Sequence, residues 1–97
     1  MERFYYVYIL VSRRNGTLYV GMTGDLPRRV YEHQVGATPG FTKKYGVKLL
    51  VYFEQHEDVG VAMVRERAIK KWRRAWKLEL IERGNPNWRD LSQVFLA

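Results

Sequence analysis

The chain contains no cysteine, and among its 97 residues it has only two histidines and three prolines. Without cysteine there is no disulfide framework, no thiolate nucleophile and no cysteine-based zinc site, and two histidines alone make a poor metal cage. No stretch approaches the roughly 20 apolar residues that span a bilayer, and no basic N-terminal region precedes a long apolar run. We therefore expect a cytoplasmic protein without a membrane partner.

Acidic residues are also scarce. Ten Asp and Glu stand against 17 Lys and Arg, which gives a net charge of +7. Such an excess attracts polyanions and favours nucleic acid as a partner, with an ordinary solvated basic surface as the alternative. A protein partner is also compatible with it. Because a chain of 97 residues has room for one modest core, we expect a single domain over residues 1–97.

The N-terminal part of the chain predicts a β-hairpin. The run YYVYILVS at 5–12 is β-branched and aromatic, with apolar residues at both parities. This pattern is typical of a central strand that is covered on both faces. Asn15 and Gly16 tolerate positive φ and favour a turn, so residues 18–22 are expected to form the return strand.

Two tyrosines lie on this hairpin. A two-residue loop places Tyr19 opposite Ser12, which shares a face with Tyr8 because strand side chains alternate. Both tyrosines then point to the same side of the sheet, but they lie roughly 13 Å apart along the strand. A bulge or a different loop is needed if they are to meet, and the sequence leaves this open.

A helix is expected after the hairpin. Asp25 is a favourable N-cap for a helix over residues 26–35. His33 lies on the apolar stripe of this helix, and Arg29 lies one turn earlier. The two side chains are therefore neighbours at the edge of the stripe.

The middle of the chain predicts a loop followed by a strand. Residues 36–46 contain the glycines, proline and polar side chains of a surface loop, and Lys43 and Lys44 lie on it. Residues 47–55 are rich in apolar and β-branched side chains, and we expect them to form a third strand.

The C-terminal half contains a long helical stretch. Asp58 can cap it, and residues 61–83 have no internal Gly or Pro, so they form one helix or two helices that join near Trp72. Glu66 falls on the apolar stripe of this stretch. The stripe consists of residues spaced three or four apart: Ala62, Ile69, Trp72, Trp76 and Leu80.

This set of residues contains the parts needed for metal-assisted phosphodiester cleavage. That reaction uses a carboxylate for a hard cation, a cation that stabilises the charge on the phosphate, and a base for water. Glu66 is a carboxylate where an apolar side chain is expected, and burying it is costly unless a metal or a neighbouring arginine compensates its charge. Arg29 could donate two hydrogen bonds to a phosphate, or it could be a solvated helix arginine.

The aromatic and imidazole side chains also allow two interpretations. His33 could assist proton transfer, or it could lie at the edge of the core. Tyr8 and Tyr19 could serve as a base, an orienting group or a phosphate ligand, or they could be ordinary core residues with satisfied hydroxyl groups.

Together these residues resemble the GIY-YIG nuclease domain. Tyr6-Val7-Tyr8 matches the first motif of that family, although Tyr6 and Val7 replace its Gly and Ile, and Tyr19-Val20-Gly21 matches the second. Arg29 stands ten residues after the tyrosine of the second motif, as the helix arginine of the family does, and His33 follows one turn later. The chain looks most like the small stand-alone bacterial members.

The C-terminal half extends this resemblance. Glu66, inside VRERAIKKW, matches the metal-binding glutamate of the family. Asn85, inside NPNW, looks like the C-terminal asparagine that braces the site, although Asn87 lies only two residues away.

The resemblance implies both a fold and a chemistry. The fold is α+β, with a three-stranded antiparallel sheet flanked by helices in the order ββαβαα. One divalent cation, Mg²⁺ or Mn²⁺, is held by Glu66, and a water is activated near Tyr8. Arg29 stabilises the attacked phosphate, while Tyr19 and His33 position the water and the tyrosine base.

We therefore expect a divalent-metal-dependent endonuclease that acts on DNA in repair or processing. The alternatives are a non-catalytic nucleic-acid-binding module with the same fold, and a basic protein-interaction domain that leaves Glu66 without a purpose. Six basic side chains are expected to contact phosphates around the metal site, although a solvated helix face is the other interpretation of most of them. They are Lys43, Lys44, Arg65, Lys70, Lys71 and Arg74.

Overall fold

The computed structural model describes residues 3–37 and 39–95. The elements follow one another as β1 (Tyr5–Val11), β2 (Leu18–Thr23), α1 (Leu26–Gln34), α2 (Phe41–Tyr45), β3 (Leu49–His56), α3 (Val59–Lys71), α4 (Arg74–Gly84) and the 3₁₀ helix η1 (Leu91–Phe95). The three strands form an antiparallel sheet in the order β2-β1-β3. The expected α+β fold with a central first strand is therefore confirmed.

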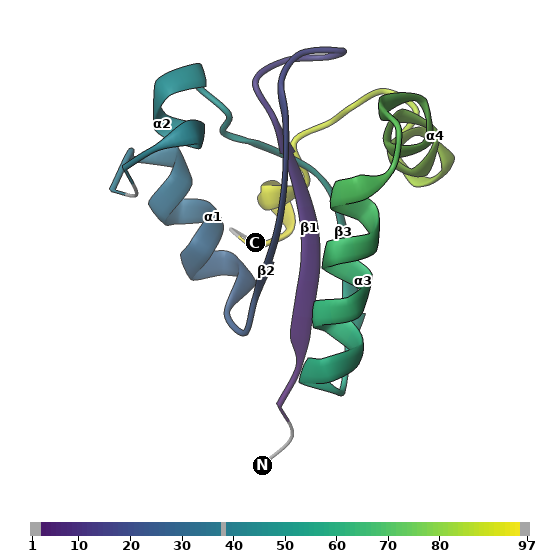
Figure 1. Ribbon diagram of the computed structural model, residues 1–97. Helices are drawn as coiled ribbons and strands as arrows, with labels where there is room; N and C mark the ends of the chain where they lie inside the picture. Colours follow the sequence, from purple (N-terminus) through teal and green to yellow (C-terminus); the bar gives the residue numbers. More distant parts are fainter. Residues whose placement is uncertain (1–2, 38, 96–97) are drawn as a thin grey trace.

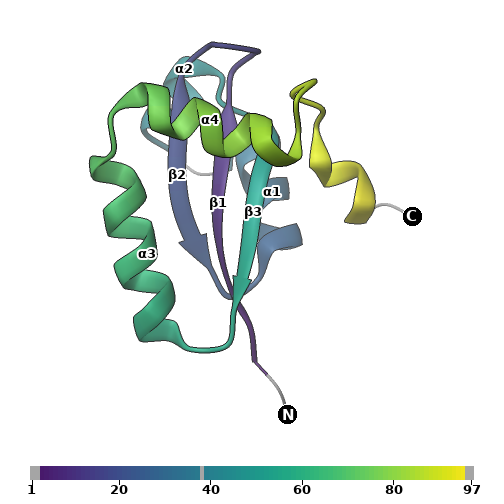
Figure 2. The ribbon, with the colours of Figure 1, turned by 90° about the vertical axis from the view of Figure 1, so that its right-hand side faces the viewer.

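Helices cover both faces of this sheet. Figure 1 shows α1 and α2 on one side of the strands and α3 and α4 on the other, with the β2 edge between the two groups. Figure 2 shows α3 running beside β2 and α4 crossing the same face near one end of the strands. Within the described residues, no helix is long and apolar enough to cross a membrane.

The core is divided into two clusters because alternate residues of β1 point to opposite faces. The cluster toward α3 and α4 is aliphatic apart from one tryptophan, and its buried members include Val7, Ile9, Val11, Ala62, Ile69, Ile81 and Trp88. The cluster toward α1 includes Tyr8, Leu10, Leu26, Val30, Val47 and Leu50. A shift in register between Ile9 and Leu10 accommodates β3 beside the central strand.

The hairpin between β1 and β2 differs from the simplest prediction. The amide of Ser12 donates to the carbonyl of Thr17 at 3.1 Å, so residues 13–16 form the loop instead of Asn15 and Gly16 alone. Asn15 does adopt the left-handed conformation, with a φ of 60°. Of the loops that the sequence left open, the structure has a longer one, which changes the register of the whole hairpin.

The helix that follows begins where it was expected. The side chain of Asp25 accepts a hydrogen bond from the amide of Arg28 at 3.3 Å, and Pro27 is tolerated in the first turn. Residues 36–46 are not only a loop, however, because they contain the short helix α2. This helix carries both Lys43 and Lys44.

The long helical stretch is two helices. Asp58 caps α3 by accepting from the amide of Val61 at 3.0 Å. Trp72 and Arg73 are both extended, which separates α3 from α4. Trp76 was expected to be buried, but it is 49% exposed because the second helix changes direction, and the Arg73 guanidinium lies 4.6 Å from its ring centroid.

Candidate active site

The tyrosines of β1 and β2 meet because of the longer hairpin loop. Tyr8 pairs with Gly21, and Tyr19 pairs with Leu10, so the two tyrosines are diagonal neighbours on the α1 face. Their ring centroids are 6.3 Å apart. This pair is brought together without a bulge in the hairpin.

Gly21 makes space for the Tyr8 phenol. A Cβ atom at this position would lie 2.5 Å from the Tyr8 hydroxyl oxygen and 2.9 Å from a ring carbon of Tyr19. Contacts this short do not occur between such atoms, so the Tyr8 ring can lie over β2 only where β2 has no side chain. The glycine of the second motif therefore has a steric role at this position.

His33 connects Tyr8 to α2. Its Nε2 atom is 3.3 Å from the Tyr8 hydroxyl, and its Nδ1 atom is 2.9 Å from the Thr42 hydroxyl. The ring is 2% exposed. Burial, and then the positive charge of Arg29, lower the pKa of His33, so the imidazole is neutral near pH 7 and has one donor and one acceptor nitrogen.

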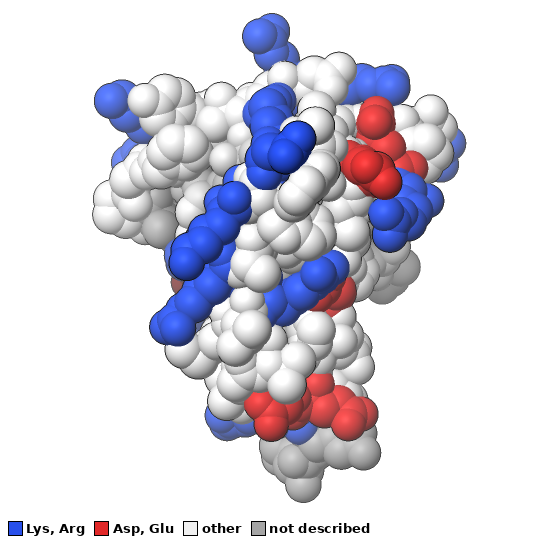
Figure 3. All heavy atoms as spheres, turned by 45° about the vertical axis from the view of Figure 1, so that its right-hand side comes forward, with Lys and Arg blue, Asp and Glu red and all other residues white. Residues whose placement is uncertain are grey.

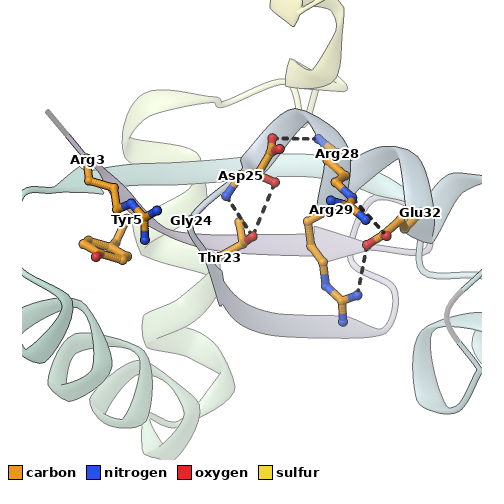
Figure 4. A pocket seen from close by; sticks show the side chains of 8 residues that line it. All are labelled: Arg3, Tyr5, Thr23, Gly24, Asp25, Arg28, Arg29 and Glu32. Carbon is orange, nitrogen blue, oxygen red and sulfur yellow. Dashed lines mark hydrogen bonds and ion pairs between the residues drawn. The ribbon is translucent and has the colours of Figure 1, made fainter. Parts of the chain in front are cut away.

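Arg29 lies beside the same phenol. Burial raises the pKa of Tyr8 to about 12, and a hydrogen bond from Arg29 acts in the opposite direction. Arg29 also contacts Glu32, with an Nη1–Oε1 distance of 3.3 Å, and Arg28 contacts the other oxygen of the same carboxylate at 3.5 Å (Figure 4). Arg29 is thus held between a phenol and a carboxylate.

A surface hollow of about 510 Å³ adjoins Arg29. Figure 4 shows that α1, the end of β2 and the start of β1 contribute its walls. Its lining consists of Arg3, Tyr5, Thr23, Gly24, Asp25, Arg28, Arg29 and Glu32. Three arginines and two carboxylates, Asp25 and Glu32, are among these residues, so the lining keeps a small net positive charge that attracts an anion.

Glu66 approaches the same region from α3. Its side chain is 20% exposed, and its Oε2 atom is 3.2 Å from the Lys70 ammonium. Its negative charge contributes to the raised pKa of Tyr8, as the smallest of the named causes. The compensating neighbour in the structure is therefore a lysine one turn away instead of the arginine considered from the sequence.

The donor set near Glu66 fits a hard cation that keeps most of its water. Among residues 3–37 and 39–95, no group of three or more His, Asp or Glu side chains could hold a metal ion. Mg²⁺ is commonly held by one or two carboxylates together with water and phosphate oxygens. A partly exposed single carboxylate whose charge acts on the Tyr8 phenol meets that requirement.

Asn85 lies apart from these residues. It is the C-cap of α4, and its side-chain nitrogen Nδ2 donates to the backbone carbonyls of Val51 at 3.1 Å and Arg89 at 2.9 Å. Its side-chain oxygen accepts from the amide of Arg89 at 3.0 Å. Val51 lies on β3, at the sheet edge opposite β2, and Arg89 lies in the turn after α4, so Asn85 braces this turn against β3. Asn87, the other candidate, is exposed.

The six predicted phosphate contacts lie on three helices, α2, α3 and α4. Lys43 and Lys44 are exposed on α2. Lys70 pairs with Glu66, whereas Lys71 lies five residues from Glu66 and so points about 140° away around the helix.

The two predicted arginines of this set are held by the protein itself. Arg65 binds Glu54, with Nε–O distances of 3.2 and 3.0 Å, and its guanidinium lies over the Trp72 ring. Arg74 donates to the carbonyls of Asn15 and Gly16 and so fastens the hairpin loop to α4. The structure therefore does not favour either arginine as a phosphate contact.

Sequence reasoning missed two residues of the site, Thr42 and Glu32, and the steric role of a third, Gly21. Thr42 lies in a segment that was expected to be an irregular loop, and no periodic pattern marked it. Glu32 follows Arg28 by four residues and Arg29 by three, a spacing typical of helical ion pairs that could have identified it. Gly21 was matched to a motif, but its contact with Tyr8 depends on a register that the sequence did not determine.

Comparisons with known proteins show the family of this chain. The family model of the GIY-YIG catalytic domain matches residues 4–79. A UPF0213 protein of Clostridium perfringens is 42% identical over 76 residues, which are 78% of this chain and 81% of that protein. A UPF0213 protein of Haloquadratum walsbyi is 38% identical over 84 residues, which are 87% of this chain and 93% of that protein.

A solved structure is also similar. The solution NMR structure of a UPF0213 protein from Bacillus halodurans has a TM-score of 0.57 and 27% sequence identity, and the match covers 94% of this chain and 96% of that one. The family match spans Tyr8, Tyr19, Arg29, His33 and Glu66, whereas Asn85 lies beyond it. The chain belongs to the GIY-YIG family of nuclease domains.

Proposed function

We propose that this protein is a divalent-metal-dependent endonuclease that hydrolyses DNA phosphodiester bonds, with repair or processing of DNA as its role. One observation carries the proposal: the side chains of Tyr8, Tyr19, His33 and Arg29 lie together on the α1 face of the sheet. The charge of Glu66, on α3, also acts on Tyr8. These groups come from four separate elements. Their convergence supports one site for a phosphate and a water molecule.

Arg29 is the proposed phosphate ligand. Its guanidinium remains charged at neutral pH and can donate two parallel hydrogen bonds to phosphate oxygens. Its contacts with Tyr8 and Glu32 fix its position before the substrate arrives. A donor held in this way stabilises the charge that develops on the phosphate in the transition state.

Tyr8, His33 and Thr42 form the proposed proton path. At neutral pH the Tyr8 phenol is protonated because burial raises its pKa to about 12. When Tyr8 takes a proton from the attacking water, its own proton can pass to Nε2 of the neutral imidazole. Thr42 accepts from Nδ1–H and so holds the tautomer that leaves Nε2 free to accept.

Glu66 is the proposed metal ligand, and Tyr19 packs against both Tyr8 and His33 to position them. A bound Mg²⁺ or Mn²⁺ supplies Lewis acidity toward a phosphate oxygen and a water. Lys70 neutralises Glu66 in the structure, and its flexible ammonium can turn toward a DNA phosphate once another cation takes its place. Lys43, Lys44 and Lys70 are the proposed contacts for the DNA strand on either side of the site.

The test is cleavage of duplex, flap, nicked, branched and single-stranded DNA with Mg²⁺, with Mn²⁺ and with chelator. We expect cleavage of at least one substrate with metal and none with chelator. Glu66→Gln should retain its thermal unfolding midpoint and its DNA affinity while losing cleavage. Glu79→Gln is the matched control, because Glu79 is an exposed glutamate on α4 that also pairs with a basic residue one turn away.

Two outcomes would contradict this proposal. Metal-dependent cleavage by Glu66→Gln at the wild-type rate would remove Glu66 from the metal site. DNA binding without cleavage of any substrate would favour a nucleic-acid-binding module that keeps the nuclease fold.

A further inference from the structure

The outer flank of α3 presents an apolar strip to solvent. Val61 and Val64 are 55% and 68% exposed, and Ala68 and Gly60 are exposed beside them. These residues are spaced three or four apart along α3, so they share one side of the helix. They line a groove of about 680 Å³, together with His56, Asp58 and Arg65.

This strip is separate from the proposed nuclease site. Glu66 follows Val64 by two residues and precedes Ala68 by two, so it points about 160° away from each of them around the helix. The charge of Glu66 acts on Tyr8, whereas the groove touches His56 at the end of β3 and does not include Glu66 in its lining. A partner bound to the strip would therefore leave the nuclease site open.

The charges at the two ends of the strip have opposite signs. Glu57 lies just before the start of α3, and Lys71 is its last residue; both are exposed. Figure 3 shows acidic side chains at the lower end of this face, basic side chains above, and uncharged surface between them. A surface of this kind is complementary to itself when it is turned through 180°.

We propose that this flank of α3 binds a second copy of the chain, with the two α3 helices antiparallel across a twofold axis near Val64. In this arrangement Val64 meets Val64 of the second copy, and Gly60 meets the other Ala68. The small side chains at those positions allow the two helix backbones to approach closely. Glu57 of each copy then lies opposite Lys71 of the other, and the pairing is isologous, as in most homodimers.

The interface is small, so the dimer is expected to be weak. One flank of a 13-residue helix offers less than the usual interface of about 800 Å² per partner. We expect a Kd on the order of 10 to 100 µM. Each dimer would carry two nuclease sites that face away from the shared helices, and dimerisation itself does not depend on nuclease activity.

The test is sedimentation velocity and equilibrium from about 1 µM to about 1 mM protein, without DNA. The mass should rise from monomer to dimer across this range. Val64→Asp should weaken dimerisation at least about tenfold, because it places two carboxylates opposite each other. The control is Val94→Asp, which makes the same substitution at another valine that is 61% exposed but lies on η1.

Charge exchange tests the antiparallel register. Glu57→Lys and Lys71→Glu should each raise the dimer Kd about threefold to tenfold, and the double variant should restore it. A protein that stays monomeric at every concentration would overturn the proposal. The partner of the strip would then have to be a different protein. Dimerisation that is unchanged in Val64→Asp would also overturn it, since the copies would then meet elsewhere.

Discussion

The face of the sheet toward α3 and α4 buries mainly aliphatic side chains, whereas the face toward α1 and α2 buries a phenol, an imidazole and a hydroxyl beside its aliphatic side chains. On the first face, Val7, Ile9 and Ile69 are fully buried. On the second, Tyr8, His33 and Thr42 are nearly as deeply buried, and each has a hydrogen-bond partner. Both faces include side chains of the central strand β1. Because successive side chains of a strand point to opposite faces, each residue of β1 belongs to one face or the other.

The two faces are therefore expected to contribute differently to the stability of the fold and to the chemistry of the site. Burial of aliphatic surface is favourable without any directional requirement, so the α3/α4 face can stabilise the fold through packing alone. Burial of polar groups is favourable only when their hydrogen bonds are satisfied, and a satisfied network adds less net stability. We expect the α1/α2 face to fix the geometry of the site and the α3/α4 face to supply most of the stability.

The largest expected effect is on the aliphatic face. Ile69→Ala should lower the free energy of unfolding by about 2 to 5 kcal/mol, because it removes a fully buried side chain and leaves a cavity. Urea denaturation measures the change. Met63→Ala, at a 39% exposed position on the same helix, is the control and should change stability by less than about 0.5 kcal/mol. Similar losses in the two variants would show that packing on this face is loose.

The next effect is on the polar face. Arg29→Ala should lower the single-turnover rate about 10²- to 10³-fold while DNA affinity falls much less, because its proposed contacts strengthen in the transition state. The rate is measured at saturating DNA. Arg28→Ala is a close control, since Arg28 lies on the same helix and pairs with the same Glu32 carboxylate. An equal loss of affinity and rate in Arg29→Ala would make Arg29 a binding residue.

The sequence predicted the elements well because their signals are local. Asp25 and Asp58 cap helices through hydrogen bonds to amides three residues later, and such caps can be recognised without the fold. Apolar residues at both parities in β1 indicated a central strand, and the sheet order agrees. The family resemblance, carried by short motifs around Tyr8 and Tyr19, is confirmed by the match over residues 4–79.

Features that depend on contacts between distant elements were not predictable in the same way. The hairpin register depends on the backbone conformation of residues 13–16, and the sequence allowed more than one loop. Thr42 contacts His33 only because α2 packs against α1. Arg74 looked available for DNA until the structure showed it bound to the hairpin loop, 58 residues away from Gly16.

A smaller effect should distinguish the DNA-facing surface from the rest of the charge. Replacing Lys43, Lys44 and Lys70 with Ala should flatten the slope of log affinity against log salt by up to about three, since each phosphate contact contributes about −0.9 on duplex DNA. All sequences should be weakened alike.

The control for this variant removes three arginines near the C-terminal end of α4, namely Arg14, Arg83 and Arg89. It lowers the net charge equally, so it separates local contacts from the general attraction of a basic protein. If the slope of log affinity against log salt is equal in the two triple variants, the three lysines are part of an ordinary basic surface and not specific phosphate contacts.

The smallest expected effect concerns a charged network around Glu54, at the rim of the aliphatic face. Although burial acts to raise it, hydrogen bonds from Arg65, Tyr52 and His56 hold the pKa of Glu54 below its ordinary value. In the acidic range the unfolded chain therefore binds more protons at this carboxylate than the folded chain does. The stability that Glu54 contributes is present above the unfolded pKa and is lost as pH falls through the folded pKa.

Glu54→Gln should therefore lower stability near pH 7 and flatten the fall in stability toward low pH. Urea denaturation from about pH 3 to about pH 7 measures both changes. Glu79→Gln, at a glutamate whose side chain is 70% exposed, should leave the profile unaltered. If Glu54→Gln also leaves it unaltered, Glu54 adds nothing to the fold, and packing alone accounts for the stability of the α3/α4 face. A flattened profile would instead show that this face, like the one that carries the candidate site, depends in part on a satisfied polar network.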